Sequence, residues 1–113
     1  MRHAVLLIAL LGSVASAQPA PTPDDAEVQV ARAKPCIAFL KEVDQQRAAG
    51  RPPGQAPSFA LVWGWLLKND PTSGGYMGKL PLGHIMFDNT LLSCQRMRER
   101  TLGATMDAEY ARL

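Results

Sequence analysis

The sequence has few residues of the kinds that catalysis or metal binding requires. It holds two histidines, His3 and His84, and two cysteines, and it contains no nucleophile elbow, zinc-protease motif or phosphate-binding glycine loop. Only His84 remains after removal of the first 17 residues, which excludes a histidine-rich metal site. The sequence therefore predicts a protein that is not an enzyme and that holds no metal and no cofactor.

The sequence also has little excess of positive over negative charge and few long apolar runs. The 113 residues carry 12 Lys and Arg against 10 Asp and Glu, without the clustered basic face that nucleic-acid binding normally needs. The one basic cluster is Arg96, Arg98 and Arg100, and basic residues in the last turn of a helix complement its negative end. Beyond residue 17 no apolar run is long enough to span a bilayer. We expect neither nucleic acid nor a membrane as a partner.

The first 17 residues have the composition of an export signal. Residues 1–3 give a short positive start, residues 4–11 are apolar, and residues 15–17 (Ala-Ser-Ala) have the small-x-small form that signal peptidase cuts. The residue directly after this site, Gln18, is not a cysteine, so nothing suggests lipid attachment. We therefore expect a protein that is exported to the periplasm and released there.

The rest of the chain divides into two parts. Residues 18–34 combine alternating Pro and Ala with acidic residues and show no helical stripe, which predicts a disordered lead-in. Residues 35–113 show helical periodicity and no β-alternation, which predicts a small all-α domain of about four short helices. We expect these helices at about 35–49, 57–68 and 81–98 and in a last segment capped by Thr105, with Met106, Tyr110 and Leu113 on one face.

The second of these helices is apolar nearly all round. A helix apolar on every face is either central in a fold or partly covered by another chain, and a domain this small has difficulty burying such a helix by itself. We therefore expect this helix to carry a surface for a client polypeptide or a second copy of the chain, although core packing is the alternative. The residues expected there are Phe59, Val62, Trp63, Trp65 and Leu66.

The two cysteines predict a structural disulfide. Cys36 lies in the first turn of the first expected helix and Cys94 near the end of the third, both on apolar faces. In an exported protein with two cysteines a bridge is the expected state, and two separate buried thiols are the alternative. The chain-entropy model gives such a bridge on the order of 4 kcal/mol of stabilisation.

Several segments together resemble one family. Residues 36–40 (CIAFL) look like the C-x-x-F-[LI] opening of the HdeA/HdeB-type periplasmic acid-stress chaperones, and residues 60–65, with Trp63 and a Gly-Trp pair, resemble that family's second helix. Residues 74–75 (Gly-Gly), followed by a helix that ends in 91–94 (LLSC), are similar to its glycine loop and second-cysteine helix. The resemblance covers about residues 35–110.

The resemblance implies a homodimer near neutral pH that loosens in acid and exposes apolar surface to unfolding periplasmic proteins. The mature chain would change from a net charge of about +1 to roughly +13 at low pH, and such self-repulsion opposes compact and associated states. Asp88 and His84, on the third expected helix, are the candidate pH triggers.

Three functions are therefore under consideration. The first is a non-enzymatic acid-stress chaperone that binds unfolding client polypeptides. The alternative is a periplasmic binding module or inhibitor that recognises one specific partner at neutral pH. The third is a small enzyme in which His84 and Asp88, four residues apart, act as a base and its orienter, although a plain surface pair explains the same spacing.

Overall fold

The computed structural model describes residues 23–72 and 75–113, and these residues form a single all-α domain. Five of its helices have ten or more residues, and α5 has five. The helices are α2 (Pro23–Ala33), α3 (Cys36–Ala48), α4 (Pro57–Lys68), α5 (Gly75–Lys79), α6 (Gly83–Arg96) and α7 (Leu102–Ala111), with 3-10 turns at Pro53–Gln55 and Leu80–Leu82. The all-α prediction is confirmed, but the expected number of about four helices is too low.

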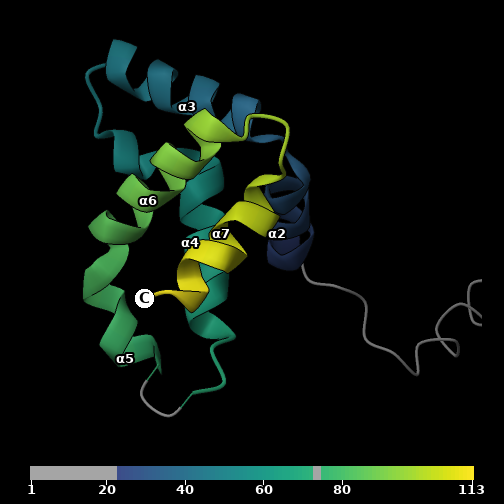
Figure 1. Ribbon diagram of the computed structural model, residues 1–113, viewed down its shortest axis with the longest axis vertical. Helices are drawn as coiled ribbons and strands as arrows, with labels where there is room; N and C mark the ends of the chain where they lie inside the picture. The colour runs from purple at the N-terminus through teal and green to yellow at the C-terminus, as the bar shows by residue number, and fades with distance from the viewer. Residues whose placement is uncertain (1–22, 73–74) are drawn as a thin grey trace, which may run out of the picture.

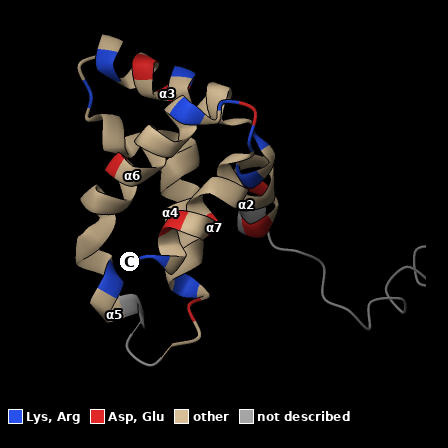
Figure 2. Cartoon of the chain, in the orientation of Figure 1, with Lys and Arg blue, Asp and Glu red and all other residues tan. Residues whose placement is uncertain are grey.

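The apolar helix α4 is the element around which the others pack. It contacts α2, α3, α5 and α7, while α6 contacts α3 and α7. Figure 1 shows α3 crossing one end of the fold, with α6 and α7 running away from it and α2 at the opposite side from α6. The central helices carry few charged residues (Figure 2). Helix α4 contains one, Lys68, and α6 contains two, Asp88 and Arg96.

Three phenylalanines from three helices form the centre of the core. Phe39 of α3, Phe59 of α4 and Phe87 of α6 have ring centroids 5.2–6.4 Å apart, and the Phe59–Phe87 pair meets edge to face. Such aromatic pairs add about 0.5–1.5 kcal/mol beyond the area that they bury. The core therefore joins α3, α4 and α6 directly.

Helix α2 corrects the expected disordered lead-in. Residues 18–34 carry no long apolar stripe, but Pro23–Ala33 form a helix in which Val28 and Ala31 are buried. These two small residues lie three apart, so they share one helix face, and α2 packs against α4 and α7 with them. Two apolar residues are too weak a signal for a sequence-based prediction. Residues 1–22, including the expected export signal, lie outside the described residues.

The predicted disulfide is confirmed. Cys36 is the first residue of α3 and Cys94 lies in the last turn of α6, with their Cα atoms 5.0 Å apart. Both residues are fully buried, and the Thr105 hydroxyl of α7 lies 3.4 Å from the Cys36 sulfur. The bridge therefore sits where three helices meet.

Backbone pairing joins two connections beside this disulfide. The Cys36 N–H donates to the carbonyl of Arg100 at 2.7 Å, and the Leu102 N–H donates to the carbonyl of Lys34 at 2.8 Å. Pro35 and Thr101 thereby form an isolated antiparallel bridge. The junction between α2 and α3 is thus fixed to the junction between α6 and α7.

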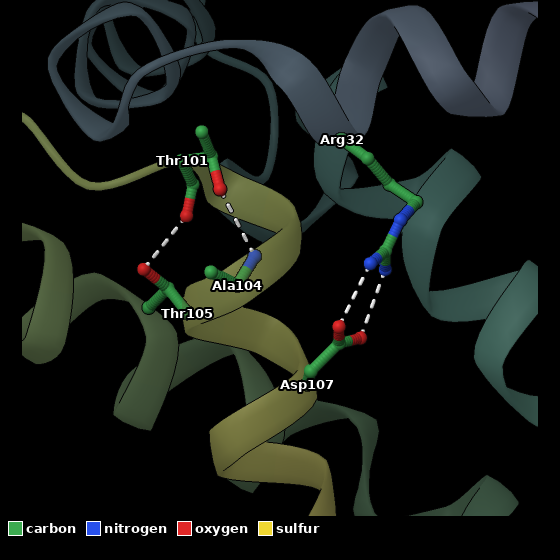
Figure 3. Close-up of polar contacts among 5 residues, drawn as sticks. All are labelled: Arg32, Thr101, Ala104, Thr105 and Asp107. Atoms are coloured by element: carbon green, nitrogen blue, oxygen red, sulfur yellow. Dashed lines mark hydrogen bonds and ion pairs between the residues drawn. The ribbon is translucent and has the colours of Figure 1, made fainter.

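The start of α7 also differs from the expectation. Thr101, not Thr105, caps the helix, because its hydroxyl oxygen accepts a hydrogen bond from the Ala104 N–H at 3.2 Å (Figure 3). Thr105 lies one turn further on and donates to the Thr101 carbonyl. The last helix therefore begins at Leu102, before the expected cap at Thr105, and α6 ends two residues earlier than predicted. The expected inner-face residues do pack in or against the core: Met106, Tyr110 and Leu113.

A carboxylate of α3 caps the start of α4. The helix has no side-chain cap of its own at Ala56, but Glu42 accepts hydrogen bonds from the Ser58 N–H at 2.9 Å and from the Ser58 hydroxyl at 2.6 Å. The Lys34 ammonium donates to the same carboxylate at 3.0 Å. Burial acts to raise the pKa of Glu42, but the hydrogen bonds from Ser58 and Lys34 outweigh it and hold the pKa below its ordinary value.

Removing the disulfide is expected to destabilise the fold by about 4 kcal/mol, because the bridge restricts the unfolded chain. The cysteines are 58 positions apart. The comparison is urea unfolding of the oxidised protein and of C36A/C94A at pH 7, followed by circular dichroism. Two curves that coincide would contradict the expectation.

The Glu42 cap predicts an acid-sensitive contribution to stability. Glu42→Gln is expected to cost about 1 kcal/mol at pH 7, since hydrogen bonds to a charged acceptor are stronger than those to a neutral one. A carboxylate with a lowered pKa stabilises the fold above its ordinary pKa and loses this effect as pH falls through the lowered value. The difference between wild type and E42Q should therefore shrink below about pH 4.5.

Asp44→Asn is the matched control for this variant. Asp44 lies on the same helix in an exposed ion pair with Arg47 at 3.8 Å, and such pairs contribute little. Urea unfolding from pH 7 to pH 3 measures both variants. An E42Q curve parallel to wild type at every pH would show that Glu42 does not carry the effect.

Candidate binding groove

The five residues expected on the surface of α4 differ in how deeply they are buried. Phe59 and Val62 are 3% and 0% exposed, so they belong to the core of this fold. Trp63, Trp65 and Leu66 are partly buried. The reason is that α2 and α3 cover parts of α4 that the sequence-based prediction left open. One side of α4, around Trp63, stays accessible.

An open groove of about 750 Å³ lies along this side of α4. Its walls are largely apolar, and they come from α4 on one side and from α5 and the following 3-10 turn on the other. The main apolar lining residues are Phe59, Trp63, Leu67, Met77 and Leu80. A cavity of this size is in the range that binds small molecules or a few side chains of a peptide.

Small residues on α4 keep the groove open. Ala60 and Gly64 both line it, and they lie one helical turn apart on the same face. A Cβ placed on Gly64 would meet no atom within 4 Å, so the space beside this glycine is empty. The groove therefore follows a strip of small residues between larger apolar ones.

The Trp63 side chain forms one wall of the groove and is held in place by its neighbours. Its indole stacks on Phe59 at 6.4 Å with an interplanar angle of 13°, and it meets the Tyr110 ring edge to face at 5.9 Å. On another side it lies against Gly83 at the start of α6, where an added Cβ would come within 3.2 Å of the indole nitrogen. Contacts on three sides hold the ring in one orientation before any ligand arrives.

A network of polar side chains closes one end of the groove around Asp70. Its carboxylate accepts hydrogen bonds from the N–H and hydroxyl of Thr72 and from the Tyr110 hydroxyl, and the Lys79 ammonium lies 3.5 Å away. The same ammonium lies 4.1 Å above the Tyr110 ring. Asp70 and Thr72 line the groove, so this network connects it to α7.

The network shifts two pKa values in opposite directions. Hydrogen bonds from Thr72 and Tyr110, with a smaller effect of the Lys79 charge, hold the pKa of Asp70 far below its ordinary value. Burial and the hydrogen bond to Asp70 raise the pKa of Tyr110 well above its ordinary value. Asp70 therefore stays ionised at pH values at which an ordinary aspartate is protonated.

A second cavity, of about 590 Å³, lies across the same aromatic wall. Phe59 and Trp63 line both spaces, and His84 and Asp88 line the second one. Both of these residues are exposed on α6, no hydrogen bond joins them, and no Ser, Thr or Cys lines this cavity in the described part of the chain. The geometry thus assembles no nucleophile with a base. The role of His84 and Asp88 as pH triggers stays a prediction.

Residues 23–72 and 75–113 hold neither a metal-binding cluster nor a helix that could span a membrane. No three His, Cys, Asp or Glu side chains there are grouped so that they could hold a metal ion. None of the helices in the same ranges has the length and apolar character needed to cross a membrane. Comparison of the chain with protein-family models, curated proteins and solved structures gave no match in any of the three.

The sequence pointed to Trp63 but not to most of the groove. Met77 and Leu80 follow a glycine-rich loop, and their one sequence signal is that they are apolar residues in a segment expected to be irregular. Asp70 and Tyr110 are 40 positions apart, so their pairing depends on tertiary structure alone. The arrangement as a whole can hold apolar groups beside Trp63 and polar groups at the Asp70 end.

Tyr110→Phe is expected to raise the pKa of Asp70 towards its ordinary value, because the variant removes one of the hydrogen bonds that stabilise the carboxylate. An NMR titration of the Asp70 carboxyl carbon measures this shift. Lys79→Gln is the comparison variant and should give a smaller rise, since the lysine acts through its charge at 3.5 Å. An Asp70 titration in Y110F that matches wild type would show that the hydroxyl does not hold this carboxylate.

Proposed function

We propose that this protein is a non-enzymatic polypeptide-binding protein of the periplasm, similar in action to the HdeA/HdeB-type acid-stress chaperones. Its groove beside Trp63 binds apolar segments of unfolding exported proteins. The observation that carries this proposal is the open groove of about 750 Å³ with a fixed aromatic wall and exposed apolar side chains opposite.

The exposed side of the groove supports a polypeptide ligand. Met77 is 73% exposed and Leu80 is 44% exposed, and methionine adapts its shape to varied apolar partners. A rigid wall at Trp63 facing a flexible wall at Met77 suits ligands that share apolar character but not sequence. Exposed apolar groups gathered at a groove are typical of an interaction site.

The polar contacts between helices support a change in acid. Glu42 ties α3 to the start of α4, and Asp107 of α7 accepts two hydrogen bonds from Arg32 of α2. Protonation of Glu42 weakens the tie between α3 and α4 while the net positive charge of the chain rises. Loosening of this kind would expose buried residues of α4 such as Phe59 and Val62. Glu42, in its hydrogen-bond network, is better placed as a trigger than the exposed Asp88 and His84.

The compartment and the assembly state belong to the same proposal. A disulfide persists in an oxidising compartment such as the periplasm, which agrees with the export signal expected at residues 1–17. The Cys36–Cys94 bridge would keep α3 and α6 joined while other contacts loosen. A homodimer near neutral pH would cover part of the exposed apolar surface.

The proposal predicts that apolar groove residues are needed to suppress client aggregation. Light scattering of an acid-denatured client at pH 2–3 is expected to fall when the wild type is added. The variant M77Q/L80Q should need several times more protein for the same effect, because two apolar walls become polar.

I85Q/L92Q is the matched control for this variant. Ile85 and Leu92 lie on α6, are 39% and 54% exposed, and line none of the cavities described above. The control should suppress aggregation as the wild type does. If the wild type fails to reduce scattering, or if both double variants behave alike, the groove is not a client site.

A second candidate function is a module that recognises one partner at neutral pH. The observation that favours it is that the groove is open in the folded state and that Asp70, at its end, is held ionised. Size-exclusion chromatography with periplasmic extract at pH 7 and at pH 3 separates the two functions. A stable one-to-one complex at pH 7 supports the module, whereas broad binding at pH 3 alone supports the chaperone.

A further inference from the structure

Helix α2 covers a second face of α4, away from the groove at Trp63. We propose that α2 is a built-in occupant of a second binding face, formed by α4 and α7, and that release of α2 opens this face to helical client segments of similar chemistry. The inference rests on the proposed function, because it names a second surface of the same polypeptide-binding protein and the contact that controls it.

The covered face is apolar and is centred on α4. Ser58 and Leu61 line a hollow together with Ala31 of α2, the Lys34 ammonium donates to the Ser58 hydroxyl at 3.1 Å, and Trp65 lies under the Arg32 guanidinium at 4.9 Å from the ring centroid. Val62, which is fully buried, shares this stripe because it lies four positions after Ser58. This face belongs to the helix that the sequence shows to be apolar nearly all round. In the folded state α2 covers part of this face, while Leu61 keeps 36% of its surface exposed.

Apolar burial holds α2 weakly. Val28 and Ala31 are its buried side chains among residues 25–33, and two side chains of this size bury little apolar area. Ordering the backbone opposes helix formation, and an isolated helix of 11 residues is marginal in water. Helix α2 therefore depends on its polar contacts as well as on these two side chains.

The main polar contact joins α2 to α7. Arg32 donates from both terminal nitrogens to the two carboxylate oxygens of Asp107, at 2.8 and 2.7 Å (Figure 3). The hydrogen bonds to Asp107 raise the pKa of Arg32, although burial acts against them. Asp107 is half exposed to solvent, so the pair lies at the edge of the covered face. A bidentate pair of this kind also fixes the orientation of α2.

A glycine permits the close approach of the two helices. A Cβ placed on Gly103, the second residue of α7, would lie 2.9 Å from the Arg32 Cβ and 3.0 Å from the Arg32 backbone oxygen. The backbone oxygen cannot move away without moving α2 itself. Gly103→Ala should therefore displace α2, even though alanine favours helix formation in α7 more than glycine does.

The chemistry of α2 indicates what the open face accepts. Helix α2 presents two small apolar residues three apart, followed directly by an arginine that meets both the Trp65 ring and the Asp107 carboxylate. The matching client segment is a short helix with small apolar residues on one stripe and a basic residue beside it. Charge complementarity with Asp107 distinguishes this segment from a purely apolar one.

The first test uses a fluorescent peptide with the sequence of α2, residues 23–33, and the full-length oxidised protein at pH 7. Arg32→Glu places two carboxylates together and should release the covalently attached α2. Hydrogen exchange of the α2 amides should then accelerate at least tenfold. The labelled peptide should bind R32E saturably and bind wild type at least tenfold more weakly, because the attached α2 competes at high effective concentration.

Two variants control for general unfolding. The charge swap R32D/D107R restores an ion pair and should restore slow exchange and exclusion of a peptide that carries Asp in place of Arg32. Gly103→Ala should release α2 in the exchange experiment but should not bind the wild-type peptide, because the added Cβ also obstructs an incoming helix. Gln29→Ala, an exposed change on α2, should behave as wild type in both measurements.

The outcomes separate this inference from the proposed function. Unchanged exchange in both R32E and G103A would show that Arg32 and Gly103 do not control α2, and the inference fails. Released α2 without saturable peptide binding to R32E would show that the uncovered face is not a binding site, and the inference fails as well. Neither result affects the comparison of M77Q/L80Q with I85Q/L92Q, which tests the groove alone.

Discussion

The Cys36–Cys94 disulfide and the backbone pairing beside it are the constraint on which the rest of the structure depends. The bridge joins the start of α3 to the end of α6, and the Pro35–Thr101 pairing then fixes the two adjoining connections together. Four helices leave this point: α2 and α3 from one connection, and α6 and α7 from the other. Their directions determine where α4 can lie. In a domain this small, one covalent link thus replaces much of the core that a larger protein would use.

This constraint does not act equally on all helices. Helices α3 and α6 are joined by the bridge and by the contact between Phe39 and Phe87. Helix α2 leaves the same connection as α3, but it buries little apolar surface. Polar contacts of Arg32 and of Lys34, which follows the helix, therefore hold it in place. The fold therefore combines two firmly joined helices, α3 and α6, with one helix, α2, that opens at a lower free-energy cost. Free energies of local opening generally differ between the elements of a protein. Both parts cover the same apolar helix, α4.

The sequence predicted what strong local patterns determine. Helix α4 begins and ends where its apolar run indicated, and the disulfide was expected from two cysteines that follow a candidate export signal. The missed elements depend on weak or distant signals. Helix α2 shows two small buried residues, and the pairing of Asp70 with Tyr110 joins residues 40 positions apart in the sequence. Of the residues expected on the surface of α4, Trp63 lines the groove, whereas Val62 is buried by elements whose position helical periodicity cannot predict.

The acidic residues that matter most differ in how they respond to protons. Glu42 is held below its ordinary pKa by hydrogen bonds that burial opposes, whereas Asp70 is held much further below it by Thr72 and Tyr110. Falling pH must therefore neutralise Glu42 before Asp70. The tie between α3 and α4 weakens first, while the polar end of the groove keeps its charge. If the protein binds unfolding proteins in acid as proposed, this order would loosen the packing around α4 while the groove beside Trp63 persists.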